Sequence, residues 1–197
     1  EQIKTCARDI VAHGRRMATI VRDFTGVTNR EAFDQQVPVP VEQILDQVLA
    51  TAQTTVEMKD IVIHKTYAGH TPVLVFPDQL RQALVNLVTN ATQAMKGTGT
   101  LTLTTAASDH TVTATIADSG PGIPKQHLSK IFDPFFTTKG QGEGSGLGLT
   151  VARRIIRKFG GDLRVESVEG QGTTCVITLP ISSPRSPEGG PWTPSAS

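Results

Sequence analysis

Two asparagines, Asn86 and Asn90, stand one helical turn apart and carry uncharged side chains that both donate and accept hydrogen bonds. The apolar residues around them recur at the three- and four-residue spacing of an amphipathic helix: Leu80, Ala83, Leu84, Leu87, Ala91 and Ala94. Carboxamides on the flank of a buried stripe suit the rim of a ligand pocket. Taken alone, the pair is more simply explained as two solvated asparagines on a helix.

A third candidate is Asp118, which ends a predicted strand in phase with Val112, Ala114 and Ile116. This phase predicts a partly buried carboxylate, and such a group needs a partner that offsets its loss of water. The glycine-containing residues 119–124 follow directly, and their backbone would let a flat ligand approach closely. A plain turn after a strand is the alternative interpretation.

Glycines at 140, 142, 144, 146 and 148 separate the segment Ile131–Lys139 from a predicted amphipathic helix. Such a glycine-rich stretch is a candidate lid. Backbone amides at a helix start form an anion site, which indicates phosphate as the ligand. Neither a P-loop nor a dinucleotide-binding fingerprint is present. A simple glycine linker would explain the composition but not the helix that follows.

The elements that must position these residues alternate between helices and strands. We expect Val37–Pro40 to be a linker that leads into an edge strand, because proline is excluded from central strands. The apolar patterns further predict helices over 41–56, 80–95 and 151–159, and strands at 61–63, 73–76, 101–103, 112–118, 162–167 and 173–179.

The first 27 residues contain two interleaved seven-residue series of mainly apolar positions. That repeat is typical of a helix in a coiled coil or four-helix bundle; a helix packed on its own domain is the alternative. We therefore expect a partial dimerisation helix at 1–32, a domain at 33–181 and a disordered tail, rich in proline, serine and glycine, at 182–197. The start at Glu1 suggests a piece of a longer protein, with any membrane anchor or sensor upstream.

Composition narrows the function classes. Of the 197 residues 38% are hydrophobic and 19% charged, with a net charge of +1, so we expect no binding of nucleic acid. No apolar run of about 18 residues exists, so no membrane span is predicted. The distant Cys6 and Cys175 favour free thiols in a reducing compartment, which indicates the cytoplasm.

Four motifs in order resemble the N, G1, F and G2 boxes of sensor histidine kinases: the asparagine helix, DSGPGIP from Asp118, IFDPFFTTK from Ile131, and GEGSGLGL from Gly142. The resemblance spans roughly residues 78–179 and is nearest in wording to the nitrogen-regulation type. It implies an α+β fold, in which a mixed β-sheet packs against a layer of helices in an α/β sandwich. A long dimerisation-type helix would precede it.

The resemblance also implies roles for individual residues. Asn90 would hold Mg²⁺ on the phosphates of ATP with support from Asn86, and Asp118 would accept a hydrogen bond from the adenine amino group. The remaining residues implied in nucleotide binding are Gly120, Gly122 and Ile123 near the base, Phe132 and Phe136 as lid anchors, and Lys139, Gly144, Gly146, Leu147 and Gly148 near the phosphates. The implied partners are a response regulator receiver domain and, through the N-terminal helix, a second copy of the chain.

The sequence departs from the family in one respect. No histidine fits the phosphoacceptor pattern, which casts doubt on self-phosphorylation by this stretch alone. Two other functions stay open. Gyrase- and chaperone-type ATPases resemble this chain but place a glutamate where Asn86 stands, and an amide cannot act as a base toward water. The third possibility is a nucleotide-binding scaffold without transfer activity.

Overall fold

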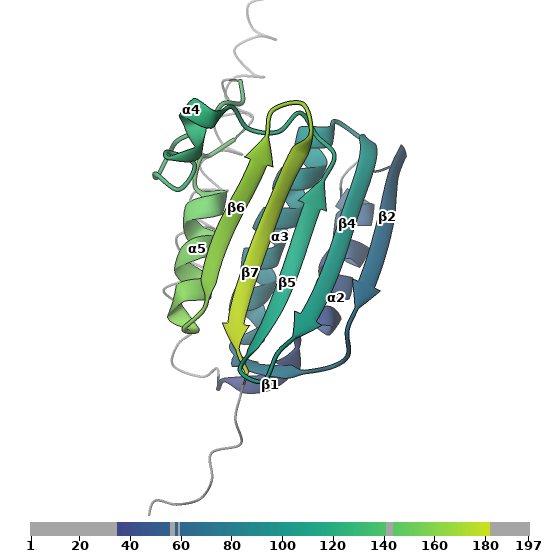
Figure 1. Cartoon of the computed structure of the whole chain (residues 1–197), viewed down its shortest axis with the longest axis vertical. Coiled ribbons are helices and arrows are strands. Elements are labelled where there is room, and N and C mark those ends of the chain that lie inside the picture. The colour runs from purple at the N-terminus through teal and green to yellow at the C-terminus, as the bar shows by residue number, and fades with distance from the viewer. Residues whose placement is uncertain (1–34, 56–57, 59, 141–143, 182–197) are drawn as a thin grey trace, which may run out of the picture.

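The computed structural model describes residues 35–55, 58, 60–140 and 144–181. Its helices are α2 (Val41–Thr55), α3 (Pro77–Met95), α4 (Lys125–Leu128) and α5 (Gly148–Lys158). Its strands are β1 (Val37–Pro40), β2 (Asp60–Tyr67), β3 (Pro72–Val75), β4 (Thr98–Ala107), β5 (Thr111–Asp118), β6 (Asp162–Val168) and β7 (Gly172–Pro180). Figure 1 shows one large sheet with α2, α3 and α5 behind it, which confirms the predicted two-layer α+β fold.

The large sheet has the strand order β2-β4-β5-β7-β6. It is mixed, because β2 pairs with β4 in parallel while the other three pairs are antiparallel. A parallel pair needs a crossover connection, and here the crossover contains β3 and α3. The topology thereby places the asparagine helix across the inner face of the sheet (Figure 1).

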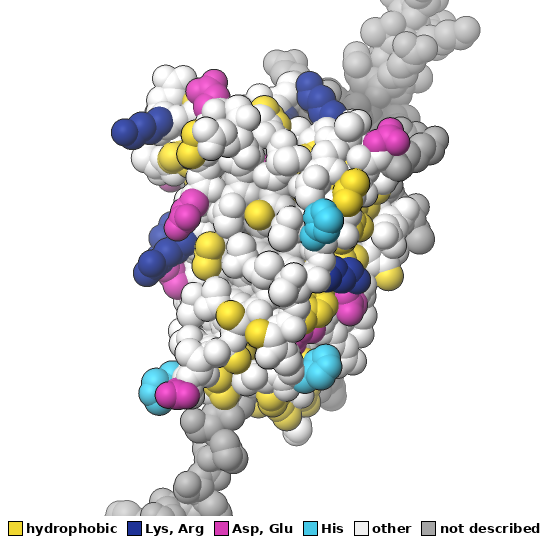
Figure 2. Space-filling model, turned by 45° about the vertical axis from the view of Figure 1, so that its right-hand side comes forward, with side chains coloured by type: hydrophobic (Ala, Val, Ile, Leu, Met, Phe, Trp, Pro, Cys, Tyr) yellow, Lys and Arg dark blue, Asp and Glu magenta, His cyan; other side chains and the backbone are white. Residues whose placement is uncertain are grey.

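The two faces of the sheet differ in side-chain type. The inner face contributes fully buried residues to the core with α2, α3 and α5, among them Leu101, Leu103, Val112, Ala114, Ile116 and Ile177. On β4 and β5 most of the alternate positions are threonines, which are only partly buried. Figure 2 shows few charged side chains over the broad middle of this outer face. The predicted phase of β5 is therefore confirmed.

The strand predicted at 73–76 does not join the large sheet. As β3 it pairs antiparallel with β1 in a separate two-stranded sheet, and Ile181 forms an isolated bridge with Val73. Val37–Pro40, which we predicted as a linker leading into an edge strand, is itself the strand β1. Because β1 and β3 each contain a proline, a small two-stranded sheet suits them better than a central position.

Several predictions fall outside the described residues: the dimerisation helix, the domain boundary at residue 33, Cys6, and the tail at 182–197. Cys175 is a free thiol. Among the described helices, none combines the length and apolar character that a membrane crossing requires.

Candidate nucleotide site

Helix α3 is set by signals at both of its ends. Pro77 occupies the first turn, where its missing N–H costs nothing, so the helix begins three residues before the apolar pattern does. Lys96 ends it in the left-handed conformation, with φ of 52°, and Gly97 follows with φ of 88°. The predicted stripe is buried except at Ala94, which is partly buried, and Asn86 and Asn90 lie half-buried on its flank.

The start of α5 lies directly beside the two asparagines. The side-chain Nδ2 of Asn86 donates to the carbonyl oxygen of Gly148 at 3.3 Å. A Cβ on Gly148 would lie 3.6 Å from Asn90 Nδ2 and 3.8 Å from Asn86 Cβ. No side chain in the described part of the chain caps α5. Its first N–H groups therefore remain for an anion at the point where both asparagines meet the helix.

Lys139 connects the segment before the glycines to the asparagine helix. Its ammonium Nζ lies 2.5 Å from Gln93 Oε1 and 3.5 Å from Asn90 Oδ1. Gln93 is not among the residues that we predicted, although its position three residues after Asn90 puts it on the same helix face. The carboxamide oxygens of α3 at this site thus attract a cation.

Asp118 lies half-buried at the end of β5, as its phase predicts. Its Oδ1 accepts from the backbone N–H of Gly120 at 2.9 Å. Burial raises the pKa of the Asp118 carboxyl above its ordinary 3.8, while the backbone N–H groups of Gly120 and Thr173 act in the opposite direction. Within the described ranges no lysine or arginine forms an ion pair with this carboxylate.

The loop after Asp118 owes its glycines to contacts within the protein. A Cβ on Gly122, where φ is 69°, would lie 2.1 Å from the carbonyl oxygen of Val168, the last residue of β6. A Cβ on Gly120 would lie 2.8 Å from Asp118 Oδ1. The sequence predicts that these glycines allow a ligand to approach the backbone closely. At Gly122 the group that approaches is instead the end of strand β6.

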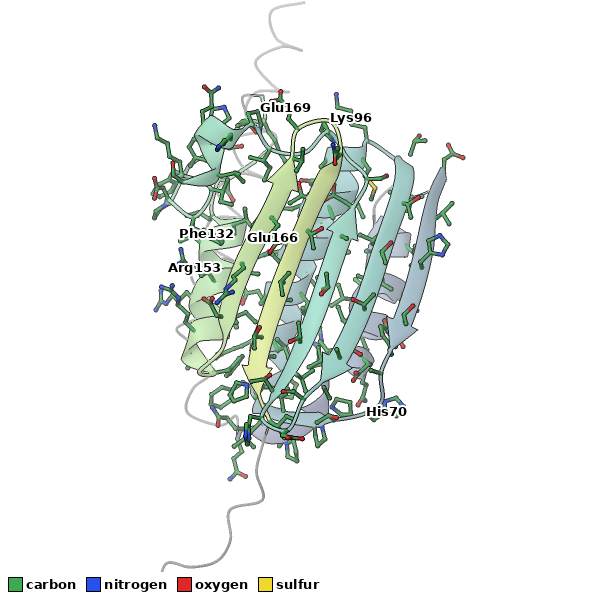
Figure 3. All side chains as sticks on the ribbon, in the orientation of Figure 1. His70, Lys96, Phe132, Arg153, Glu166 and Glu169 are labelled. Atoms are coloured by element: carbon green, nitrogen blue, oxygen red, sulfur yellow. The ribbon has the colours of Figure 1, made fainter. Side chains whose placement is uncertain are left out.

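The phenylalanine segment is attached to α5. The guanidinium of Arg153 lies 4.3 Å from the centroid of the Phe132 ring, and Thr150 Oγ1 donates to the Phe132 carbonyl at 3.0 Å. Figure 3 shows Phe132 and Arg153 close together near α5, on one edge of the molecule. Phe136 packs on the imidazole of His127, with 5.5 Å between ring centroids.

A backbone hydrogen bond joins the phenylalanine segment before the glycines to the end of the glycine-rich stretch. The N–H of Phe135 donates to the carbonyl of Gly146 at 3.0 Å. Phe135 has a φ of 68°, rare for a bulky residue, and is 60% exposed. A Cβ on Gly146 would lie 2.4 Å from the carbonyl carbon of Phe135, so only glycine fits at 146. Leu147 beside it is buried, and Gly144 lies against Thr137 and Lys139.

All thirteen predicted site residues thus lie in the segments that meet at one end of the sheet, around α3, the end of β5 and the start of α5. Gln93, Arg153, Ser167 and Thr173 also contact them and were missed. Arg153 was recognisable only as one of two adjacent arginines on a predicted helix, and Ser167 and Thr173 only as ordinary strand residues.

Comparison with known proteins agrees with this geometry. Residues 76–183 match the family of histidine kinase-, DNA gyrase B-, and HSP90-like ATPases. The chain is 43% identical to the sensor histidine kinase ZraS of Escherichia coli K12 over 109 residues, which cover 55% of this chain and 23% of ZraS. It is 32% identical to sporulation kinase C of Bacillus subtilis 168 over 145 residues, 73% of this chain and 33% of that kinase. The chain thus spans a quarter to a third of these relatives.

Solved structures give the same result. The mycobacterial sensor histidine kinase MprB superposes with a TM-score of 0.65 at 29% identity, covering 74% of this chain and 97% of MprB. Full-length ShkA in complex with AMPPNP superposes with a TM-score of 0.72 at 28% identity, covering 90% of this chain and 38% of ShkA. The chain therefore belongs to the family of histidine kinase-, DNA gyrase B-, and HSP90-like ATPases, and it contains the ATP-binding catalytic domain of a sensor histidine kinase.

Proposed function

We propose that this domain binds Mg-ATP and transfers the γ-phosphate to a histidine on a dimerisation domain, for relay to an aspartate of a response regulator. The observation that carries the proposal is the contact of Asn86. Its amide donates to the Gly148 carbonyl at the start of α5, at the position where a related ATPase would keep a glutamate to activate water. Transfer to an imidazole needs no such base, because the imidazole is itself the nucleophile.

In this proposal Asp118 accepts from the adenine amino group, since an ionised carboxylate offers only acceptors. Gly120, Gly122 and Ile123 form the backbone beside the base. Phe132 and Phe136 anchor the lid through α5 and α4. The phosphates lie against Lys139, Gly144, Gly146, Leu147 and the amides from Gly148 onward. The uncapped start of α5 and the carboxamides of α3 support this placement.

The residues present fit a magnesium ion held jointly with phosphate. Asn90 Oδ1 already lies 3.5 Å from the Lys139 ammonium, so its oxygen faces positive charge. No group of three or more histidine, cysteine or acidic side chains able to hold a metal occurs among the described residues. Magnesium commonly takes one or two protein oxygens and completes its shell with phosphates and water. Asn90 would hold the ion, and the ion would supply charge neutralisation at the phosphates.

The chain's own residues would act by positioning. Phosphoryl transfer depends mainly on alignment and on the neutralisation of developing charge. Lys139 and the α5 amides would stabilise negative charge on the phosphate oxygens. Asn86 would hold α3 and the start of α5 in register, so that Asn90 and these amides face the same phosphates. Closure of the segment between Phe135 and Gly146 would exclude water from them.

Two other functions compete with the kinase. A gyrase- or chaperone-type ATPase would need a general base where Asn86 donates a hydrogen bond. A nucleotide-binding scaffold needs only the pocket, and an intact set of Asn90, Asp118 and glycines favours an active enzyme over it. We place the kinase first for these reasons.

The test follows labelled γ-phosphate of ATP with and without an added dimerisation bundle that carries an acceptor histidine. We expect acid-labile, alkali-stable label on the bundle, and its loss in Asn90→Ala. Rapid release of free phosphate without the bundle, abolished by Asn90→Ala, would instead establish the ATPase. Bound ATP with neither transfer nor release would leave the scaffold.

Further partners follow from the same proposal. We infer that the chain forms a homodimer through residues 1–32 and that its phosphorylated acceptor engages a receiver domain, with ATP as its nucleotide partner and no nucleic acid. We place this domain in the cytoplasm, where ATP is available, whether or not the longer protein is anchored in a membrane upstream. Sedimentation that shows a monomer at all concentrations would contradict the dimer.

A further inference from the structure

A row of polar side chains crosses the sheet at the site end. The register pairs Asp118 of β5 with Thr173 of β7, and Thr173 with Ser167 of β6. Directly opposed residues of antiparallel strands point to the same face. Leu101, next to Asp118 in this row on β4, is fully buried. Thr173 and Ser167 therefore lie on the inner face in line with the Asp118 carboxylate.

Ser167 is the centre of a small hydrogen-bond network. Its Oγ accepts from the backbone N–H of Ile123 at 2.8 Å and donates to the carbonyl of Gly172 at 2.8 Å. The same Oγ lies 2.9 Å from Thr173 Oγ1. A serine hydroxyl has one proton and two lone pairs. Since its proton goes to Gly172, the Thr173 hydroxyl must donate its own proton to Ser167. Thr173 Oγ1 then offers only lone pairs to any other partner.

The surrounding backbone holds Ser167 in this position. The turn that follows it, residues 168–172, interlocks with the loop after Asp118. Gly170 N–H donates to the Pro121 carbonyl at 2.7 Å. A Cβ on Gly172, where φ is 106°, would lie 1.9 Å from the Asp118 carbonyl oxygen. The turn cannot shift without moving this loop, so the direction of the Thr173 hydroxyl is fixed by the fold.

We propose that Ser167 is a positioning residue that selects adenine: by taking the proton of Thr173 it makes the row beside Asp118 a surface of acceptors. Such a surface suits the exocyclic amino group of adenine. It disfavours hypoxanthine and guanine, which carry a carbonyl at the same ring position. The inference rests on the proposed nucleotide function and adds a base-selectivity determinant outside the four recognised motifs.

The experiment compares the Kd values of Mg-ATP and Mg-ITP by calorimetry, because inosine differs from adenosine at this carbonyl. We expect the unmodified protein to prefer ATP by at least about tenfold. Ser167→Ala should reduce this preference about fivefold, since the freed Thr173 proton can turn toward the carbonyl of ITP. A merely structural role would weaken both nucleotides alike and leave the ratio unchanged.

Ser108→Ala is the matched control. Ser108 Oγ also accepts from a backbone N–H, donates to a carbonyl and contacts a threonine hydroxyl, all of Thr111, but in the β4–β5 hairpin at the opposite end of the sheet. The ratio of the Mg-ITP and Mg-ATP Kd values for Ser108→Ala should equal that of the unmodified protein. An equal drop in this control would overturn the proposal.

Thr173→Val provides a second variant should Ser167→Ala fail to fold. Thr173→Val removes the acceptor itself, so it should also lower the preference for ATP over ITP. In the double variant, Ser167→Ala should lower this preference no further. An unchanged ratio in Thr173→Val overturns the proposal. If the unmodified protein binds neither nucleotide, the proposed function fails instead. Normal ATP preference with unchanged variant ratios removes only the role of Ser167.

Discussion

Two aspartates on this domain have opposite electrostatic environments. Asp46 of α2 is exposed, and its Oδ1 lies 2.8 Å from Lys65 Nζ and 3.1 Å from Tyr67 Oη, both on β2. The hydrogen bond from Lys65 is the main cause that lowers the pKa of Asp46, whereas burial raises that of Asp118. Asp118 is held by backbone N–H groups alone, with no cation paired to it within the described part of the chain.

The difference separates a carboxylate that is paired within the fold from one that we propose is kept for a ligand. Away from the nucleotide site, polar groups satisfy one another, as Asp46 and Lys65 do. At the site, the carboxylate loses water without gaining a counter-ion, an arrangement typical of functional positions. Figure 3 marks the two ends of the molecule by Lys96 and Glu169 at the site end and His70 at the other.

The largest expected effect comes from Asp118→Asn. At a hundredfold excess over its Kd, Mg-ATP should stabilise the unmodified protein by about 2.7 kcal/mol, a melting shift on the order of 5 to 10 °C. Asp118→Asn should abolish the shift, because the carboxamide can present its NH₂ group where adenine needs an acceptor. Asp46→Asn is the matched control and should keep it. Scanning calorimetry with and without Mg-ATP measures both. A full shift in Asp118→Asn would remove the adenine assignment.

A smaller effect is expected from Thr105→Val, which perturbs only the far part of the sheet. Thr105 Oγ1 donates to Oε1 of Glu42 at 2.7 Å, and Glu42 is only 3% exposed. Losing this donor from a buried carboxylate should cost about 1 to 3 kcal/mol of unfolding free energy. The Kd of ATP should not change. Thr104→Val, on the partly exposed outer face, is the control that should be nearly neutral.

Urea denaturation and nucleotide titration together check this prediction. A stable Thr105→Val protein would show that Glu42 finds another donor. If Thr105→Val weakened ATP binding while Thr104→Val did not, the two ends of the sheet would be coupled, which the comparison of the two aspartates does not anticipate.

The smallest effect is a pH dependence of base binding. Adenine needs Asp118 ionised, so the affinity for adenosine should fall as the pH drops through the raised pKa of Asp118, by about tenfold per pH unit below it. The unliganded protein behaves oppositely: a raised folded pKa favours the native state at low pH, and this contribution is lost as the pH rises through it. Adenosine avoids titration of phosphate groups. A flat affinity profile down to pH 4 would contradict the raised pKa.

The sequence predicted most of the fold because its local patterns agree with the final packing. The stripe from Leu80 to Ala91 is buried, and the alternation from Val112 to Asp118 places the carboxylate on the inner face at the strand end. The order of the four motifs predicted that the remaining candidate residues belong to one site, and they lie near one end of the sheet. The second sheet escaped prediction because nothing in the pattern at 73–76 distinguishes pairing with β1 from pairing within the large sheet.

The missed residues depend on contacts between distant parts of the chain. Ser167 meets Ile123 across 44 positions, and Lys139 meets Gln93 across 46. Neither contact leaves a periodic signal, because each arises from strand register or from the path of a loop. Helix spacing alone could have suggested Gln93, as it lies on the same face as Asn90.

The strand order has a consequence for local motion. The strand ladders of the large sheet run between residues 60 and 180, yet no described residue between 119 and 147 takes part in them. If residues 125–140 cover the bound nucleotide, as we propose, they can open without breaking a strand ladder of the large sheet. Such a local opening costs less free energy than global unfolding, so nucleotide would exchange while the sheet remains intact.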